Sequence, residues 1–126
     1  MTPQSLADVA ASASAGDSFD RCLANFLDAF YAEPEQRFLD PTPVLLAPKF
    51  GDAGRVQDAY LAATAEELAR KFTLQVPAWV ADQARQLRRP WFASTLDGLR
   101  TVLILESPPA FRSRNLFVSE NALNRA

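Results

Sequence analysis

The sequence predicts a mainly α-helical fold: a single small helical domain over residues 1–126, with five to seven helices and little or no strand. Two observations favour this class. Apolar residues recur at spacings of three and four along most of the chain, and residues typical of helix N-caps precede several of these stretches. No segment alternates apolar and polar residues over more than a few positions. With 126 residues, 48% of them hydrophobic, the chain can build one core.

Two helices are expected in the N-terminal part. Thr2 followed by Pro3 is typical of a helix start, and Gly16 is expected to end this first helix. The second helix is predicted over residues 18–32, with a clean amphipathic stripe of Phe19, Cys22, Leu23, Phe26, Leu27 and Phe30. Cys22 is therefore expected to be a buried thiol.

The middle of the chain is predicted to be a connector followed by a long helix. Four prolines within residues 34–48 leave room for only a short helical turn over residues 35–39. The connector is expected to pack its apolar residues across the core: Val44, Leu45, Leu46 and Phe50. The long helix is predicted over residues 53–71, with its stripe at 56–72 facing the stripe at 19–30.

The C-terminal part is predicted to hold several shorter helices. The first starts near Ala78 and carries arginines at its end. For the next one, capped by Ser94, we favour helix over strand at residues 101–105. A third is expected to be capped by Ser107 and begun by Pro108. Asn115 is expected to adopt the left-handed backbone conformation and end this helix. Ser119 is expected to cap a last helical turn.

The sequence lacks most residues that carry catalysis. It has no histidine, which removes histidine-based catalytic and zinc sites, and its one cysteine cannot form a thiolate metal cluster. Four scattered glycines form no phosphate-binding loop. The adjacent carboxylates Glu66 and Glu67 would diverge by about 100° on a helix and are read as a solvated face. We therefore expect no enzyme, no cofactor and no metal.

The single cysteine and the N-terminus also bear on location. One cysteine cannot form an intramolecular disulfide, and the Ala/Ser-rich N-terminus is too weakly hydrophobic for a signal peptide or a membrane span. The expectation is a cytoplasmic protein with no membrane contact.

Charge is unevenly distributed although the net charge is only −2. The N-terminal half, residues 1–63, has four Lys/Arg against nine Asp/Glu, whereas residues 64–126 have nine against six. The basic cluster of Arg85, Arg88 and Arg89 precedes Trp91 and Phe92, a combination used in nucleic-acid contacts. We favour the interpretation that the two aromatic residues lie in the core and the arginines in water.

The C-terminal part, residues 76–126, bears a particular series of motifs. It reads VPAWV, then RRPWFAS, then LRTVLILESPPAFRSRNLFVSENALNRA. This series resembles a family of small uncharacterised bacterial proteins that end in an ESP-x-x-F-R-x-R-N-x-F-V run and a terminal L-x-R-A. The resemblance implies an antitoxin-like role beside nucleotidyltransferase-like proteins. It implies no catalytic residues, and the first 75 residues match only in being helical and acidic.

Function is accordingly expected to be protein binding. The leading hypothesis is an antitoxin-like or regulatory partner of a neighbouring gene product, which uses either the acidic half or the C-terminal run. The candidate interaction residues are Arg112, Arg114, Asn115, Glu106, Trp91 and Phe92. Glu106 is also a candidate for a local ion pair with either nearby arginine. One alternative is a nucleic-acid-binding regulator, which the net acidity of the chain disfavours. A second alternative is a small carboxylate-dependent enzyme. The sequence is also compatible with a homo-oligomer.

Overall fold

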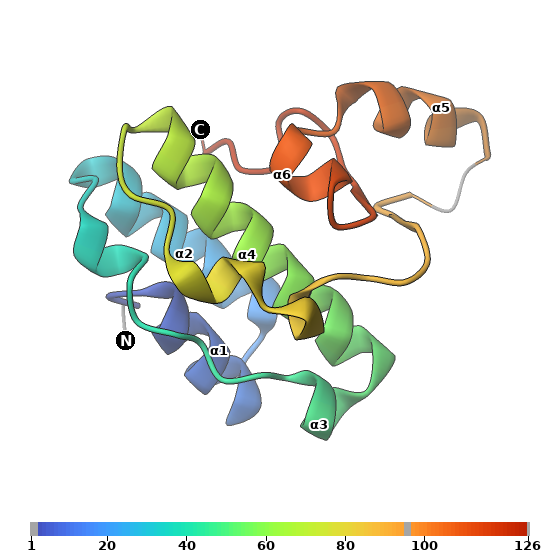
Figure 1. The fold of residues 1–126 in the computed structure, drawn as a ribbon. Coiled ribbons are helices and arrows are strands. Elements are labelled where there is room, and N and C mark those ends of the chain that lie inside the picture. Colours follow the sequence, from blue (N-terminus) through green and yellow to red (C-terminus); the bar gives the residue numbers. More distant parts are fainter. Residues whose placement is uncertain (1–2, 95–96, 126) are drawn as a thin grey trace.

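The computed structural model describes residues 3–94 and 97–125, and in this part the chain forms six α-helices and one small sheet (Figure 1). This confirms the mainly helical fold class. Three 3-10 helices complete the set. In chain order the elements are α1 (Leu6–Ser14), α2 (Phe19–Ala32), η1 (Gln36–Phe38), α3 (Ala47–Phe50), α4 (Asp52–Lys71), η2 (Ala78–Ala81), η3 (Gln83–Arg85), β1 (Trp91–Phe92), α5 (Asp97–Glu106), α6 (Pro109–Arg112) and β2 (Leu116–Phe117).

Helices α1 and α2 pack against each other at the N-terminal end of the chain. The start of α1 differs from the prediction: its N-cap is Ser5, whose hydroxyl oxygen accepts a hydrogen bond from the Asp8 N–H at 3.2 Å. Thr2, the predicted cap, lies outside the described residues. The α2 prediction is confirmed, because Ser18 caps a helix that ends at Ala32.

The long helix α4 is central, and its contacts reach α3, α6, β2 and the 3-10 helices η2 and η3 (Figure 1). Side chains of α2 and α4 meet as predicted. The rings of Phe19 and Tyr60 lie 6.4 Å apart between centroids, and those of Phe30 and Phe72 lie 5.3 Å apart. Cys22 is buried in the same cluster, as expected.

The proline-rich connector packs on the core less completely than predicted. Leu46 is fully buried, but Val44, Leu45 and Phe50 are exposed by 54%, 37% and 40%. Asp58 of α4 fixes the connector, because its carboxylate accepts hydrogen bonds from the N–H groups of Leu46 and Ala47 at 2.7 and 3.1 Å. The connector is thus held by its backbone, which leaves several of its side chains in water.

The segment predicted as one short helix from Ala78 forms two 3-10 helices instead. Asp82 separates them, with extended backbone and a carboxylate that accepts a hydrogen bond from the Ala84 N–H at 2.9 Å. Arg85 was expected in water but is only 1% exposed. Its guanidinium donates to the Pro43 carbonyl oxygen and lies 4.8 Å from the Trp79 ring centroid. Arg85 is therefore held inside the fold by one carbonyl acceptor and one aromatic ring, while its Nε and Nη1 are buried without a hydrogen-bond partner among the described residues.

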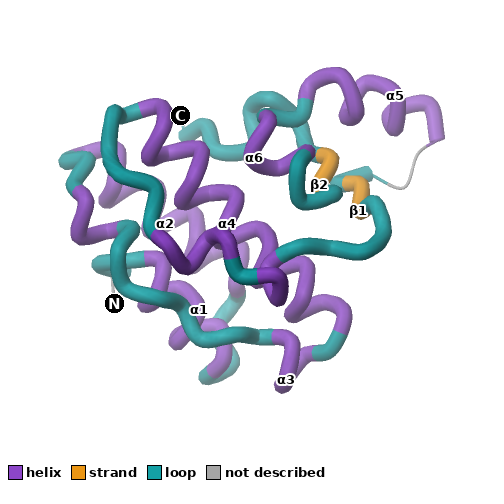
Figure 2. Tube along the Cα trace, in the orientation of Figure 1, coloured by secondary structure: helices purple, strands orange, loops and turns teal. Residues whose placement is uncertain are grey.

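The C-terminal part carries the small sheet and α5. Strands β1 and β2 are parallel, with Trp91 opposite Leu116 and Phe92 opposite Phe117 (Figure 2). Residues 101–105 are helical, as favoured. The Ser107 prediction is wrong: α6 begins at Pro109 without a side-chain cap. The Ser107 hydroxyl oxygen instead accepts a hydrogen bond from the Val118 N–H at 2.8 Å, which ties the end of α5 to the end of β2.

In the described part of the chain, no helix has both the length and the apolar character that a membrane crossing requires.

Candidate functional site

Arg114, one of the predicted interaction residues, is buried and has only 4% of its surface exposed. Its guanidinium donates to Glu66 Oε1 at 2.9 Å, to the Ala110 carbonyl oxygen at 2.7 Å and to the Val80 carbonyl oxygen at 3.1 Å. These contacts join α6, α4 and η2. Arg114 therefore pairs with Glu66 and not with the predicted Glu106, and Glu66 does not belong to a solvated face.

Asn115 takes the predicted left-handed conformation, with φ of 63°. Its side-chain amide donates to the Leu87 carbonyl oxygen at 2.7 Å, and its own carbonyl oxygen accepts a hydrogen bond from the Trp91 N–H at 2.8 Å. Asn115 thus fixes the backbone of Trp91 against the C-terminal run. Its contribution is to position β1.

Arg112 and Glu106 lie apart from this network. Arg112 is exposed on α6, while Glu106 is half-buried at the end of α5. The structure shows no ion pair for either side chain within residues 3–94 and 97–125. The predicted local ion pair of Glu106 is therefore not formed, and of the two arginines in the run only Arg112 faces solvent.

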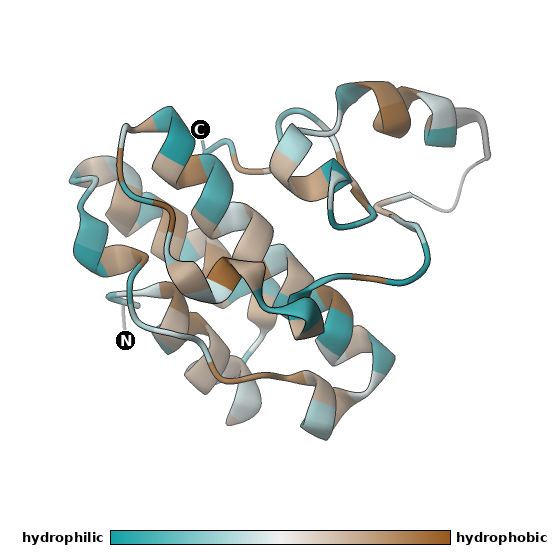
Figure 3. Ribbon diagram, in the orientation of Figure 1, coloured by the Kyte–Doolittle hydropathy of each residue, from teal (hydrophilic) through white to brown (hydrophobic). Residues whose placement is uncertain are grey.

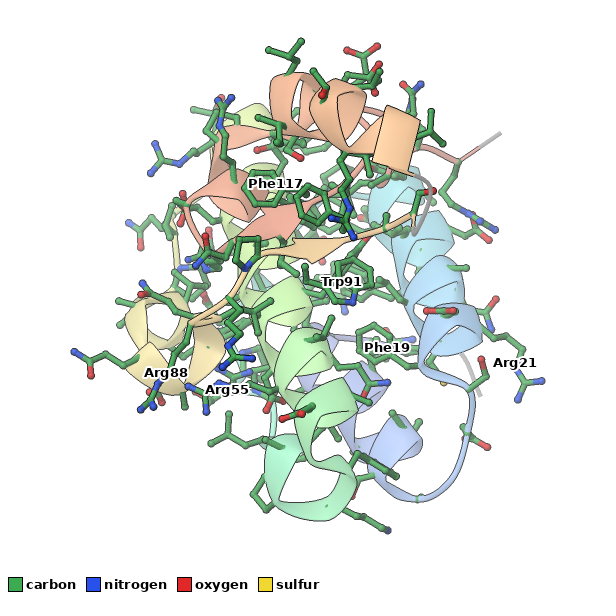
Figure 4. All side chains as sticks on the ribbon, turned by 90° about the vertical axis from the view of Figure 1, so that its right-hand side faces the viewer. Phe19, Arg21, Arg55, Arg88, Trp91 and Phe117 are labelled. Atoms are coloured by element: carbon green, nitrogen blue, oxygen red, sulfur yellow. The ribbon has the colours of Figure 1, made fainter. Side chains whose placement is uncertain are left out.

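Trp91 and Phe92 were both expected in the core, and neither is fully buried. Phe92 is partly exposed and stacks on Phe117, with ring centroids 5.0 Å apart, and the Arg100 guanidinium lies 5.2 Å from its ring. Trp91 is 36% exposed. Figure 4 shows its indole facing the space between α2 and α4, on the same side as Phe19. Successive residues of a strand point to opposite faces of the sheet. Because Phe92 faces Phe117 and Arg100, the Trp91 side chain lies on the other face, toward solvent.

A groove of about 610 Å³ lies beside Trp91, between α2, α4, β1 and the C-terminal segment. Its size is typical of ligand pockets. We call it the Trp91 groove. Most of its walls are apolar, and they are formed by Phe19, Leu23, Ala24, Leu27, Ala53, Val56, Tyr60, Trp91, Ala93, Val118 and Ala122, with the polar residues Asp20, Gln57, Ser119, Asn124 and Arg125.

Two of the polar groups on these walls, those of Gln57 and Tyr60, lie among the apolar residues of α4. The side-chain oxygen of Gln57 is buried and has no hydrogen-bond partner among the described residues. The Tyr60 ring is held edge-on between Phe19 and Phe111. Burial, with a smaller contribution from the nearby Asp20 charge, raises the pKa of Tyr60 to about 12. The Tyr60 hydroxyl, neutral at neutral pH like that of any tyrosine, therefore stays neutral further into the alkaline range.

Replacement of Tyr60 by phenylalanine is expected to remove a phenol titration near pH 12. The folded-state pKa is raised above the ordinary value of 10, so the stability linked to the neutral phenol is complete below pH 10 and is lost as pH rises toward 12. Phenolate absorbance after a rapid alkaline pH jump, before unfolding, measures the midpoint. Tyr31→Phe is the matched control and should leave this transition in place. A Tyr60 midpoint near 10 would contradict the burial.

A second hollow of about 500 Å³ adjoins the Trp91 groove and has a different character. Val56 and Trp91 line both. We call the second hollow the arginine pocket, because its remaining walls are Arg55, Arg88, Arg89, Asp52, Leu87 and Pro90. Three cations against one carboxylate give this surface a positive local charge, and Figure 4 shows Arg55 and Arg88 on the side of Trp91 away from Phe19.

Helix α5 lies above the Trp91 groove in Figure 4 and exposes apolar residues of its own. Leu99, Val102 and Leu105 are exposed by 44%, 42% and 76%, and Ile104 by 43%. The spacing of three places Leu99, Val102 and Leu105 along one stripe of the helix. In Figure 3, α5 lies at the edge of the molecule and part of its ribbon is coloured brown, as hydrophobic. Of its described side chains, only Leu103 is buried.

Sequence reasoning missed most of the groove. Phe19, Leu23, Val56 and Tyr60 follow core-forming periodicity, so the sequence placed them in the interior and not on a groove wall. Arg55 carries no local signal. Trp91 was the one groove residue among the predicted candidates.

Neither a metal site nor a known relative adds to this description. The described residues contain no group of three or more His, Cys, Asp or Glu side chains able to hold a metal ion. No protein-family model, curated protein or solved structure matches the chain.

Proposed function

We propose that this chain is a non-enzymatic protein-binding module that acts in the cytoplasm as an antitoxin-like or regulatory partner of a neighbouring gene product. The exposed stripe of α5 carries this proposal. Large apolar side chains gathered on one exposed helix are unfavourable in water and are typical of protein interfaces. A stripe of Leu99, Val102 and Leu105 matches the mode in which an amphipathic helix docks into a groove of its partner.

The resemblance of residues 76–126 supports the same proposal and suggests a nucleotidyltransferase-like partner. The C-terminal run contributes in two ways. Arg114 and Asn115 hold α6 and β1 in place, while Arg112 stays exposed on α6. The run is thus a framework that presents α5 and Trp91 on one face.

Substitution of Val102 by glutamate is expected to abolish the complex with the neighbouring gene product without unfolding the chain. A charge on the stripe would have to be desolvated at the interface. The measurement is co-purification from cells that express the tagged chain with each neighbouring product. Val44→Glu is the matched control, because Val44 is exposed by 54% in the connector.

Complexes of the wild type and Val44→Glu that persist while Val102→Glu loses its partner would support the proposal. Thermal unfolding of both variants checks the fold. Equal co-purification of Val102→Glu and wild type, or no complex with any neighbouring product, would contradict it.

A nucleic-acid-binding regulator is the second candidate, favoured by the arginine pocket beside the exposed Trp91. Arginine and an aromatic face are the groups that hold single-stranded nucleic acid. The net charge of −2 and the cover of Arg100 over Phe92 reduce the surface available for it. Such binding is expected to be weak and to fall steeply with salt.

A further inference from the structure

We infer that the Trp91 groove receives an acidic segment of the partner protein, with one large apolar side chain in the groove and carboxylates on the arginine pocket. This inference rests on the proposed protein-binding function and names the chemistry of the partner. Its geometric basis is the shared wall: Val56 and Trp91 line both hollows, so an extended segment that fills one continues directly into the other.

The apolar part of the site fits an anchor side chain. Phe19, Tyr60 and Trp91 provide aromatic walls, and small alanines leave the space between them open. Tryptophan is among the residues that dominate binding energies at protein interfaces, especially at the centre of a contact. Trp91 has this central position, with the groove on one side and the cations on the other (Figure 4).

The polar groups of the groove fit a peptide backbone. A buried acceptor without a partner is costly, and the Gln57 side-chain oxygen is in that state among the described residues. Rotation of the Gln57 amide into the groove would let a backbone N–H of an inserted segment bond to this oxygen. The Tyr60 hydroxyl belongs to another residue of the groove wall and can donate to a backbone carbonyl of the same segment.

Charge selects the acidic segment and its direction. Arg88 and Arg89 are exposed, and within residues 3–94 and 97–125 the Arg55 guanidinium makes only a long hydrogen bond of 3.4 Å to the Gln86 carbonyl oxygen. Their guanidinium groups are therefore available for carboxylates, which arginine binds with two parallel hydrogen bonds. Asp20 lines the groove but not the arginine pocket, and the groove's one cation, Arg125, is already paired with Asp28, so repulsion disfavours the reverse orientation.

The test uses synthetic peptides on the full chain, followed by ¹⁵N nuclear magnetic resonance. Each peptide carries one phenylalanine followed by a run of glutamates in a Gly/Ser background, with the spacing varied. Two controls replace the glutamates by glutamines or the phenylalanine by alanine. The acidic anchored peptide is expected to shift the Trp91 indole signal, and each control to bind at least about tenfold more weakly, a difference of about 1.4 kcal/mol.

Variants of the chain locate the binding. Ala24→Trp fills the groove and is expected to abolish the shifts, while Arg55→Glu with Arg88→Glu should weaken binding at least about tenfold and reduce its salt dependence. The matched control is Arg21→Glu, because the Arg21 side chain points away from the groove (Figure 4). Unfolding midpoints confirm that each variant folds.

Three results would overturn the inference: equal binding of the glutamine and glutamate peptides, undiminished binding by Ala24→Trp, or tighter binding of oligothymidylate than of the acidic peptide. The last would favour a nucleic-acid ligand. A partner complex that is lost in Val102→Glu but kept in Ala24→Trp would refute this inference and leave the proposed function intact. Peptide binding without any partner complex would do the reverse.

Discussion

Replacing Arg114 by alanine is expected to lower the free energy of unfolding by about 3–5 kcal/mol, the range for breaking a buried ion pair. Arg114 is 4% exposed and donates to Glu66, Ala110 and Val80. Its removal takes one donor each from the Glu66 carboxylate and from the Val80 and Ala110 carbonyl oxygens, of which Ala110 keeps a hydrogen bond from the Ser113 hydroxyl at 3.2 Å. Arg70, which also contacts Glu66, is exposed and offsets little of this loss.

Urea unfolding midpoints of Arg114→Ala and Arg112→Ala distinguish a buried, stabilising arginine from an exposed one in the C-terminal run. Arg112→Ala is the matched control, since the same change at an exposed arginine costs within about 0.5 kcal/mol. Arg112 lies two residues away on the same run. Similar midpoints for both variants would show that the Arg114 network contributes little, and Arg114 would return to the list of interface candidates.

Substitution of Gly54 by alanine is expected to destabilise the chain by about 1–3 kcal/mol, the usual cost of overpacking. In an ordinary helix interior the same change stabilises by roughly 0.5–1 kcal/mol. Here an added Cβ would overlap the backbone of Leu46 and lie 2.7 Å from the Ala47 nitrogen. Backbone atoms held by Asp58 cannot move aside easily.

The opposite change at the neighbouring position provides the control. Ala53 is exposed, so Ala53→Gly should cost about 1 kcal/mol through helix propensity alone. Thermal or urea unfolding measures both variants, and each is expected to be less stable than the wild type. A Gly54→Ala variant more stable than the wild type would mean that α3 does not approach α4 as closely as the structure shows.

Local patterns predicted the helices and missed the long-range contacts. The stripe from Phe19 to Phe30 identified α2, because spacings of three and four depend only on nearby residues. Arg114 was matched with Glu106 for the same reason. Its true partner, Glu66, lies 48 residues away in sequence and is brought close only when α6 packs on α4.

Trp91 shows the same limit at the candidate site. An aromatic pair after Pro90 suggests core, and the choice of which ring is covered depends on pairing with β2 and on Arg100 from α5. The need for glycine at position 54 likewise comes from α3, which approaches from outside the helix. Such features follow from tertiary contacts that no spacing rule contains.

Hydrogen–deuterium exchange of the chain, alone and in complex with its neighbouring gene product, tests the central claim most directly. The account predicts new protection in α5, in residues 91–93 and at the start of α2, with little change in α1 and α3. Protection confined to α1 and α3, or none at α5 and β1, would contradict the claim that this chain binds its partner through the face that carries α5 and the Trp91 groove.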